Sequence, residues 1–67
     1  MNVSQAEFEY LKEQLTTQMI VILTEEKGYD LEDAIDKIYS SEIYEKLSDK
    51  NTGLFLQSPR YVLSYLS

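Results

Sequence analysis

The segment FEYLKEQLTTQMIVIL, Phe8 to Leu23, decides the fold of this chain. Its apolar residues recur every three or four positions, which is the period of an α-helix with one buried face. They are Phe8, Leu11, Leu15, Met19, Ile22 and Leu23. The β-branched run from Thr16 to Thr24 could instead form a buried strand. However, the helical period continues through that run without a turn residue, so the sequence predicts a long N-terminal helix.

Capping residues predict where this helix and three shorter ones begin and end. Ser4 and Glu7 have the spacing of a capping box, and Gly28 suits the left-handed turn that ends a helix. The residues that can accept a hydrogen bond from a first helical turn are Ser4, Asp30, Ser40 or Ser41, and Ser58. The helices are expected over about 5–27, 31–39, 41–48 and 59–66. We therefore predict a single all-α domain, residues 1–67, in which the long helix is packed by three short ones.

The predicted long helix carries a second stripe, nearly opposite the first, that contains no charge. It consists of Tyr10, Gln14, Thr17, Val21 and Thr24. A surface helix with one buried face normally carries charges on its far side. Here the charges lie on the flanks, at Glu9, Glu13 and Glu25. We expect the second stripe to be covered, either by another helix of the same chain or by a second copy.

Composition limits the chemistry that the chain can perform. There is no cysteine and no histidine, which removes disulfides, thiolate metal sites and the usual general base. The only two glycines, Gly28 and Gly53, cannot form a phosphate-binding loop. We expect no catalysis, no cofactor, no metal site and no small-molecule ligand.

The negative net charge favours protein partners over nucleic acid. Twelve acidic residues against six basic ones give a net charge of −6, which repels a phosphate backbone. The carboxylates gather in the middle of the chain, and the candidate acidic surface consists of Glu32, Asp33, Asp36, Glu42 and Glu45. This surface could meet a basic partner, or it could simply be the solvated side of short helices.

No targeting or membrane segment is predicted. The longest purely apolar run is Met19 to Leu23, whereas a secretory core needs about 7–15 such residues and a membrane span about 20. We expect a cytoplasmic protein that does not enter a membrane.

The tail TGLFLQSPRYV, Thr52 to Val62, carries one charge in eleven residues. It could be a displayed binding motif, but burial explains its low charge better. We expect it to act as a closing segment, in which a turn at glycine leads three apolar residues across the core and Ser-Pro starts the last helix. The closing segment consists of Gly53, Leu54, Phe55, Leu56, Ser58, Pro59 and Tyr61. In that last helix, Tyr61, Val62 and Tyr65 are expected to lie on the long helix.

Two stretches, YSSEIYEKL and TGLFLQSPRYVLSYL, resemble a group of very short bacterial proteins that share a domain of unknown function. The recurring tail of that group combines a glycine, an aromatic residue, a leucine and a Ser-Pro pair. Here the tail is filled by Gly53, Phe55, Leu56, Ser58, Pro59 and Tyr61. The resemblance implies a small helical accessory or antitoxin-like protein, and it carries no known activity or site residues.

Together these observations predict a non-catalytic protein–protein interaction module. The alternative is a self-assembling homodimer with a structural role. An enzyme or a DNA-binding protein ranks third.

Overall fold

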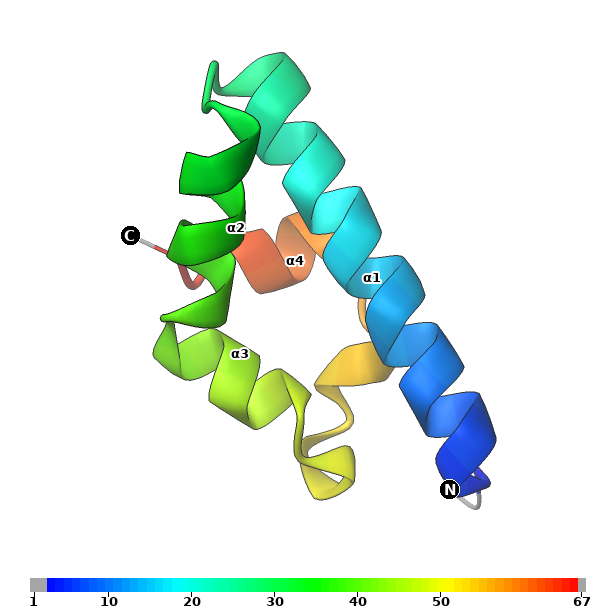
Figure 1. Ribbon diagram of the computed structural model, residues 1–67. Coiled ribbons are helices and arrows are strands. Elements are labelled where there is room, and N and C mark those ends of the chain that lie inside the picture. The colour runs from blue at the N-terminus through cyan, green and yellow to red at the C-terminus, as the bar shows by residue number, and fades with distance from the viewer. Residues whose placement is uncertain (1–2, 67) are drawn as a thin grey trace.

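The computed structural model describes residues 3–66, and every regular element in that range is helical (Figure 1). The elements are α1 (Gln5–Glu26), α2 (Leu31–Tyr39), α3 (Glu42–Leu47), the short 3₁₀ turns η1 (Lys50–Thr52) and η2 (Leu54–Leu56), and α4 (Pro59–Leu63). The predicted all-α fold is confirmed. The strand alternative for Thr16 to Thr24 is wrong, because this segment continues α1 and its buried side chains follow the helical period.

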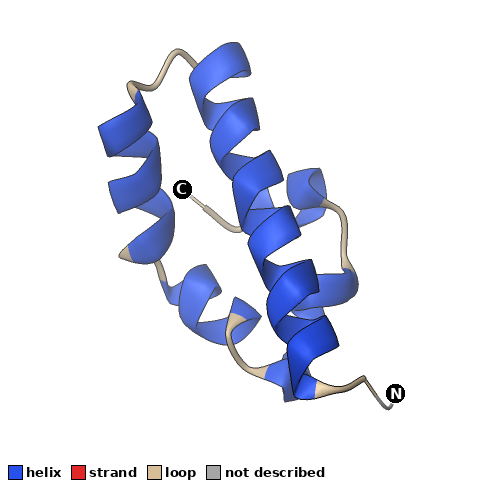
Figure 2. Cartoon of the chain, turned by 45° about the vertical axis from the view of Figure 1, so that its right-hand side comes forward, coloured by secondary structure: helices blue, strands red, loops and turns tan. Residues whose placement is uncertain are grey.

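Helix α1 is the axis on which the other elements are assembled. The described molecule measures 37 × 18 × 17 Å, and the 22 residues of α1, at about 1.5 Å each, run along most of its length. After the turn at residues 27–30, α2 returns beside α1, and α3 continues at an angle (Figure 1). Helix α4 and turn η2 contact α1 from a second side. The three short helices approach α1 from these two sides and leave one face of α1 uncovered (Figure 2).

The core lies between these elements. Ten apolar side chains are buried, from every helix and from η2: Phe8, Leu15, Met19, Leu23, Ala34, Ile38, Ile43, Leu47, Phe55 and Val62. Leu11 and Ile22, which were predicted to belong to the buried stripe of α1, are only half-buried. Thr16 is buried in addition, and its hydroxyl donates to the Lys12 carbonyl at 2.8 Å. This bond within its own helix allows a polar residue to face the core.

Most of the predicted caps are present. The Ser4 hydroxyl accepts from the Glu7 amide at 3.1 Å, and the Glu7 carboxylate accepts from the Ser4 amide at 2.9 Å. Gly28 has a φ of +76°, as a left-handed helix end requires. Ser41, rather than Ser40, caps α3, and Ser58 caps α4. Asp30 precedes α2 as predicted, but its side chain accepts no hydrogen bond from the helix.

Acid is expected to weaken the N-terminal cap of α1. Hydrogen bonds from Ser4 lower the pKa of Glu7 below its ordinary value of 4.5. A lowered folded-state pKa means that the stabilisation is present above pH 4.5 and is lost as pH falls through the folded-state pKa. Glu7→Gln, which keeps an acceptor at every pH, should lose less stability on acidification than the wild type. The measurement is the free energy of unfolding, obtained by urea denaturation at pH values above and below 4.5.

The control for this measurement is Glu45→Gln. Glu45 is exposed on α3 and its carboxylate forms no hydrogen bond or ion pair within residues 3–66, so this variant should keep the pH dependence of the wild type. Equal acid sensitivity of Glu7→Gln and Glu45→Gln would contradict a role for the cap.

The closing segment is only partly buried, and this corrects the prediction for Leu56. Gly53 has a φ of +71° between the two 3₁₀ turns, and Phe55 is buried with its ring edge-to-face on Phe8 at 4.9 Å. Leu54 is half-buried, whereas Leu56 is 45% exposed. Side chains in a 3₁₀ turn point about 120° apart, so three consecutive residues cannot all cross the core.

Helix α4 is also shorter than expected and ends at Leu63 instead of residue 66. After Leu63 the backbone forms tighter bonds, from the Tyr65 amide to the Val62 carbonyl at 3.1 Å and from the Leu66 amide to the Leu63 carbonyl at 2.9 Å. One helical turn can direct only part of its residues inward, so Val62 is fully buried while Tyr61 and Tyr65 are 46% and 57% exposed. Of the three residues predicted to lie on α1, Val62 is buried, whereas Tyr61 and Tyr65 remain largely exposed.

Within residues 3–66, α1 is the longest helix, and neither it nor any shorter one has the length and apolar content that crossing a membrane requires.

Candidate functional site

The uncharged stripe of α1 is exposed, and we call it the outer face. It consists of Tyr10, Gln14, Thr17, Val21 and Thr24. Tyr10 is 61% and Val21 43% exposed, Gln14 and Thr17 are exposed, and Thr24 is half-buried. Figure 2 shows α1 at the front, with α2 and α3 on one side and η2 and α4 on the other. Of the two coverings that the sequence left open, the one by another helix of the same chain is therefore wrong for residues 3–66.

Two shallow hollows run beside the outer face, and Thr17 borders both of them. The first, the tyrosine hollow, has a volume of about 260 Å³ and lies between α1 and the tyrosines at the junction of α2 and α3. Its lining consists of Lys12, Glu13, Thr16, Thr17, Ile20, Tyr39 and Tyr44. The second, the proline hollow, has a volume of about 480 Å³ and is lined by Thr17, Gln18, Val21, Ile22, Pro59 and Arg60. The outer face is thus a ridge with a groove on each side.

A third hollow, of about 330 Å³, lies at the N-terminal end of the same ridge. It is lined by Ala6, Glu7, Tyr10 and Leu11. The half-buried side chain of Leu11 gives it an apolar floor beside the exposed ring of Tyr10. The apolar surface of α1 therefore extends over most of the helix length.

The tyrosine hollow is bordered by a pair of stacked rings. The ring centroids of Tyr39 and Tyr44 lie 4.7 Å apart with a tilt of 32°. Tyr44 is half-buried, whereas Tyr39 is 53% exposed. The sequence does not reveal this pair as a border of the outer face, because one residue ends α2, the other lies in α3, and their contact depends on the angle between the helices.

Two cations near the outer face, Lys12 and Arg60, are already bound within the chain. The Lys12 ammonium lies 3.1 Å from Glu9 and 5.6 Å from the centre of the Phe8 ring. The Arg60 guanidinium donates to both carboxylate oxygens of Glu26, which lowers the pKa of Glu26 and raises that of Arg60. Both pairs are partly exposed, so their contribution to stability is small.

Two of the three carboxylates on the flanks of the outer face, Glu13 and Glu25, have no such partner within residues 3–66. Both side chains are exposed. The surface along α1 therefore combines an uncharged ridge with negative edges.

The structure does not join the predicted acidic surface into one site. Glu32, Asp33 and Asp36 lie together on the exposed side of α2, around a hollow of about 390 Å³ that also includes Ile35. The two acidic residues of α3, Glu42 and Glu45, are exposed elsewhere. In the described range 3–66, no group of three acidic side chains is arranged to hold a metal ion.

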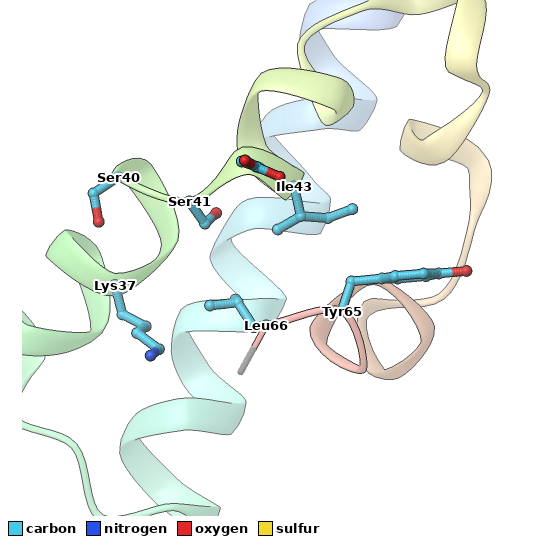
Figure 3. A pocket seen from close by; sticks show the side chains of 7 residues that line it. Lys37, Ser40, Ser41, Ile43, Tyr65 and Leu66 are labelled. Atoms are coloured by element: carbon cyan, nitrogen blue, oxygen red, sulfur yellow. The ribbon is translucent and has the colours of Figure 1, made fainter.

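A polar hollow of about 350 Å³ separates the junction of α2 and α3 from the end of the chain (Figure 3). Its two serine hydroxyls donate to backbone carbonyls, Ser40 to Asp36 and Ser41 to Ile38, both at 2.6 Å. The ring of Tyr65 points away from the two serines (Figure 3). These contacts serve the helix ends, and they assemble no nucleophile with a base.

Comparison with protein-family models, with curated proteins and with solved structures found no match for this chain. The resemblance to short bacterial proteins of unknown function therefore stays a prediction.

Proposed function

We propose that this protein is a non-catalytic interaction module that binds another protein through the outer face of α1. The observation that carries the proposal is an exposed, uncharged helical face with a hollow on each side. Helices pack by placing the ridge of one into the groove of another, and this surface offers both. Tyrosine is enriched at protein interfaces, and Tyr10 and Tyr39 are both largely exposed along this side of the molecule.

The composition supports binding over catalysis. The sequence contains no histidine and no cysteine, so its serine hydroxyls lack the usual activating base. An accessory or antitoxin-like role in the bacterial cytoplasm is the biological setting that the sequence resemblance suggests. A neutralising protein acts by covering a partner, which requires a binding surface and no reaction.

The second candidate is self-association through the same face. Tyr10 and Val21 are exposed on an otherwise uncharged helical surface, which a second copy could cover. A homodimer would also give a 67-residue chain additional buried area, which domains of this size often need.

Site-specific photo-crosslinking in cells that express the protein natively tests both candidates. A crosslinking amino acid at Thr17, on the ridge, should capture a partner, and the same amino acid at Glu45, on α3, should not. An adduct of twice 7.8 kDa would identify a second copy, and any other mass identifies a different protein. Val21→Glu should abolish the adduct at Thr17 while circular dichroism remains unchanged.

Two results would contradict the proposal. One is the absence of any adduct at Thr17, and the other is equal capture at Thr17 and Glu45.

A further inference from the structure

We infer that the partner is a basic amphipathic helix and that one of its arginines enters the tyrosine hollow. This inference rests on the proposed function, since it names the class of partner for the same face. It goes beyond that function by assigning an anchor site to Glu13 and Tyr39.

The charges around the outer face favour a basic partner. Glu13 borders the tyrosine hollow, is exposed, and forms no ion pair within residues 3–66. The only cation in the lining of that hollow is Lys12, and its ammonium is held 3.1 Å from Glu9. The hollow therefore presents an unneutralised carboxylate, and complementary charge on a partner would increase both its association rate and its specificity.

The aromatic border explains why the expected anchor is arginine. Tyr39 is 53% exposed and is supported from behind by Tyr44, whose ring lies 4.7 Å away. A guanidinium group stacks on an aromatic face and can bind a carboxylate with two parallel hydrogen bonds. Glu13 and Tyr39 line the same hollow, so one arginine side chain can engage both groups.

The walls of the tyrosine hollow suit the aliphatic part of an arginine. Thr16 is buried, and its hydroxyl is occupied by the Lys12 carbonyl. Ile20 is half-buried beside it. The methylene groups of a long basic side chain can pack on the carbon atoms of these two residues within an otherwise largely polar lining, while the charged end stays at the rim.

A second copy of the chain fits this surface less well. Its outer face contains no cation, and each chain has a net charge of −6. Dimerisation would bring two negative surfaces together without neutralising Glu13. A partner helix with an apolar stripe flanked by arginines would supply both the apolar contact and the positive charge that neutralises Glu13.

Three short helical peptides test the inference on the intact protein. All share one leucine stripe, and the residues that flank it are arginine, its neutral isostere citrulline, or glutamate. The arginine peptide should bind, shift the amide resonances of Glu13, Thr17 and Tyr39, and lose affinity at high salt. The citrulline and glutamate peptides should bind at least about three-fold more weakly.

Variants locate the binding to the hollow. Glu13→Gln and Tyr39→Leu should each weaken the arginine peptide by about three-fold or more, whereas Glu45→Gln, the matched change on α3, should not. Both altered residues are exposed, and thermal melts confirm that each variant is folded. An equal effect of Glu45→Gln would show general attraction to a negative protein and would overturn the anchor site. Equal binding of the citrulline peptide would overturn the requirement for a cation.

Different results would contradict the arginine-binding site and the proposed interaction module. One result is a Thr17 adduct in cells that Glu13→Gln and Tyr39→Leu leave unchanged. It would overturn the arginine-binding site at Glu13 and Tyr39 but would still support an interaction module. If Thr17 captures nothing, both are overturned.

Discussion

Replacing Phe55 with alanine is expected to unfold much of the protein at room temperature. The Phe55 side chain is 5% exposed and meets the Phe8 ring edge-to-face at 4.9 Å, which joins η2 to α1. Truncation of a buried phenylalanine costs about 3–5 kcal/mol. A single core in a chain of this length supplies little more than about 3–5 kcal/mol of stability. The expected result is a large loss of helical circular dichroism without denaturant, or a urea midpoint close to zero.

The neighbouring residue provides a matched control. Leu56 has the same apolar character and lies in the same 3₁₀ turn, but it is 45% exposed. Leu56→Ala should therefore change the free energy of unfolding by no more than about 0.5 kcal/mol. Comparable losses for Phe55→Ala and Leu56→Ala would contradict the orientation of this turn.

The second large effect is expected for Met19→Ala, at the centre of α1. Met19 is fully buried among side chains from the other helices. Truncation to alanine leaves a cavity and should cost about 2–5 kcal/mol, measured by urea denaturation. Alanine is the best helix former, so this loss cannot come from the helix itself and must reflect lost packing.

Val21→Ala is the control on the opposite side of the same helix. Val21 is 43% exposed, and its truncation should change the free energy of unfolding by no more than about 0.5 kcal/mol. If a second copy covered the outer face, Val21→Ala would destabilise the protein, and the melting temperature of the wild type would rise with protein concentration. A large loss in Val21→Ala at low concentration would contradict the exposure of this face.

Much of the local structure could be predicted from short-range patterns. The spacing of Phe8, Leu15, Met19 and Leu23 predicts α1, because residues three and four apart share one side of a helix. The Ser4–Glu7 cap and the start of α4 at Ser58 depend on hydrogen bonds across three residues, and the turn at Gly28 is closed by a bond across six, from the Tyr29 amide to the Leu23 carbonyl. Because the two partners of each bond lie within a few residues of each other, the sequence alone indicates them.

The predictions for the C-terminal segment share one source of error. Leu56 was expected to cross the core, and Tyr61 and Tyr65 to lie on the long helix, because all three belong to an apolar segment; all three are largely exposed. Low charge predicts that a segment contacts the core, but it does not indicate which side chains point inward. In η2 and in the single turn of α4, the direction of each side chain is decided by the backbone.

Residue spacing and composition were enough to predict an all-helical domain, with α1 as its longest element and no charge on the far side of α1. These properties follow from residue spacing and capping within a few positions along the chain. The exposure of this side, and the positions of Tyr39 and Pro59 at the hollows beside it, became apparent from the packing of the helices. The physical reason is that α2, α3 and α4 approach α1 from two sides and leave one face uncovered, at angles that depend on contacts between residues far apart in the sequence.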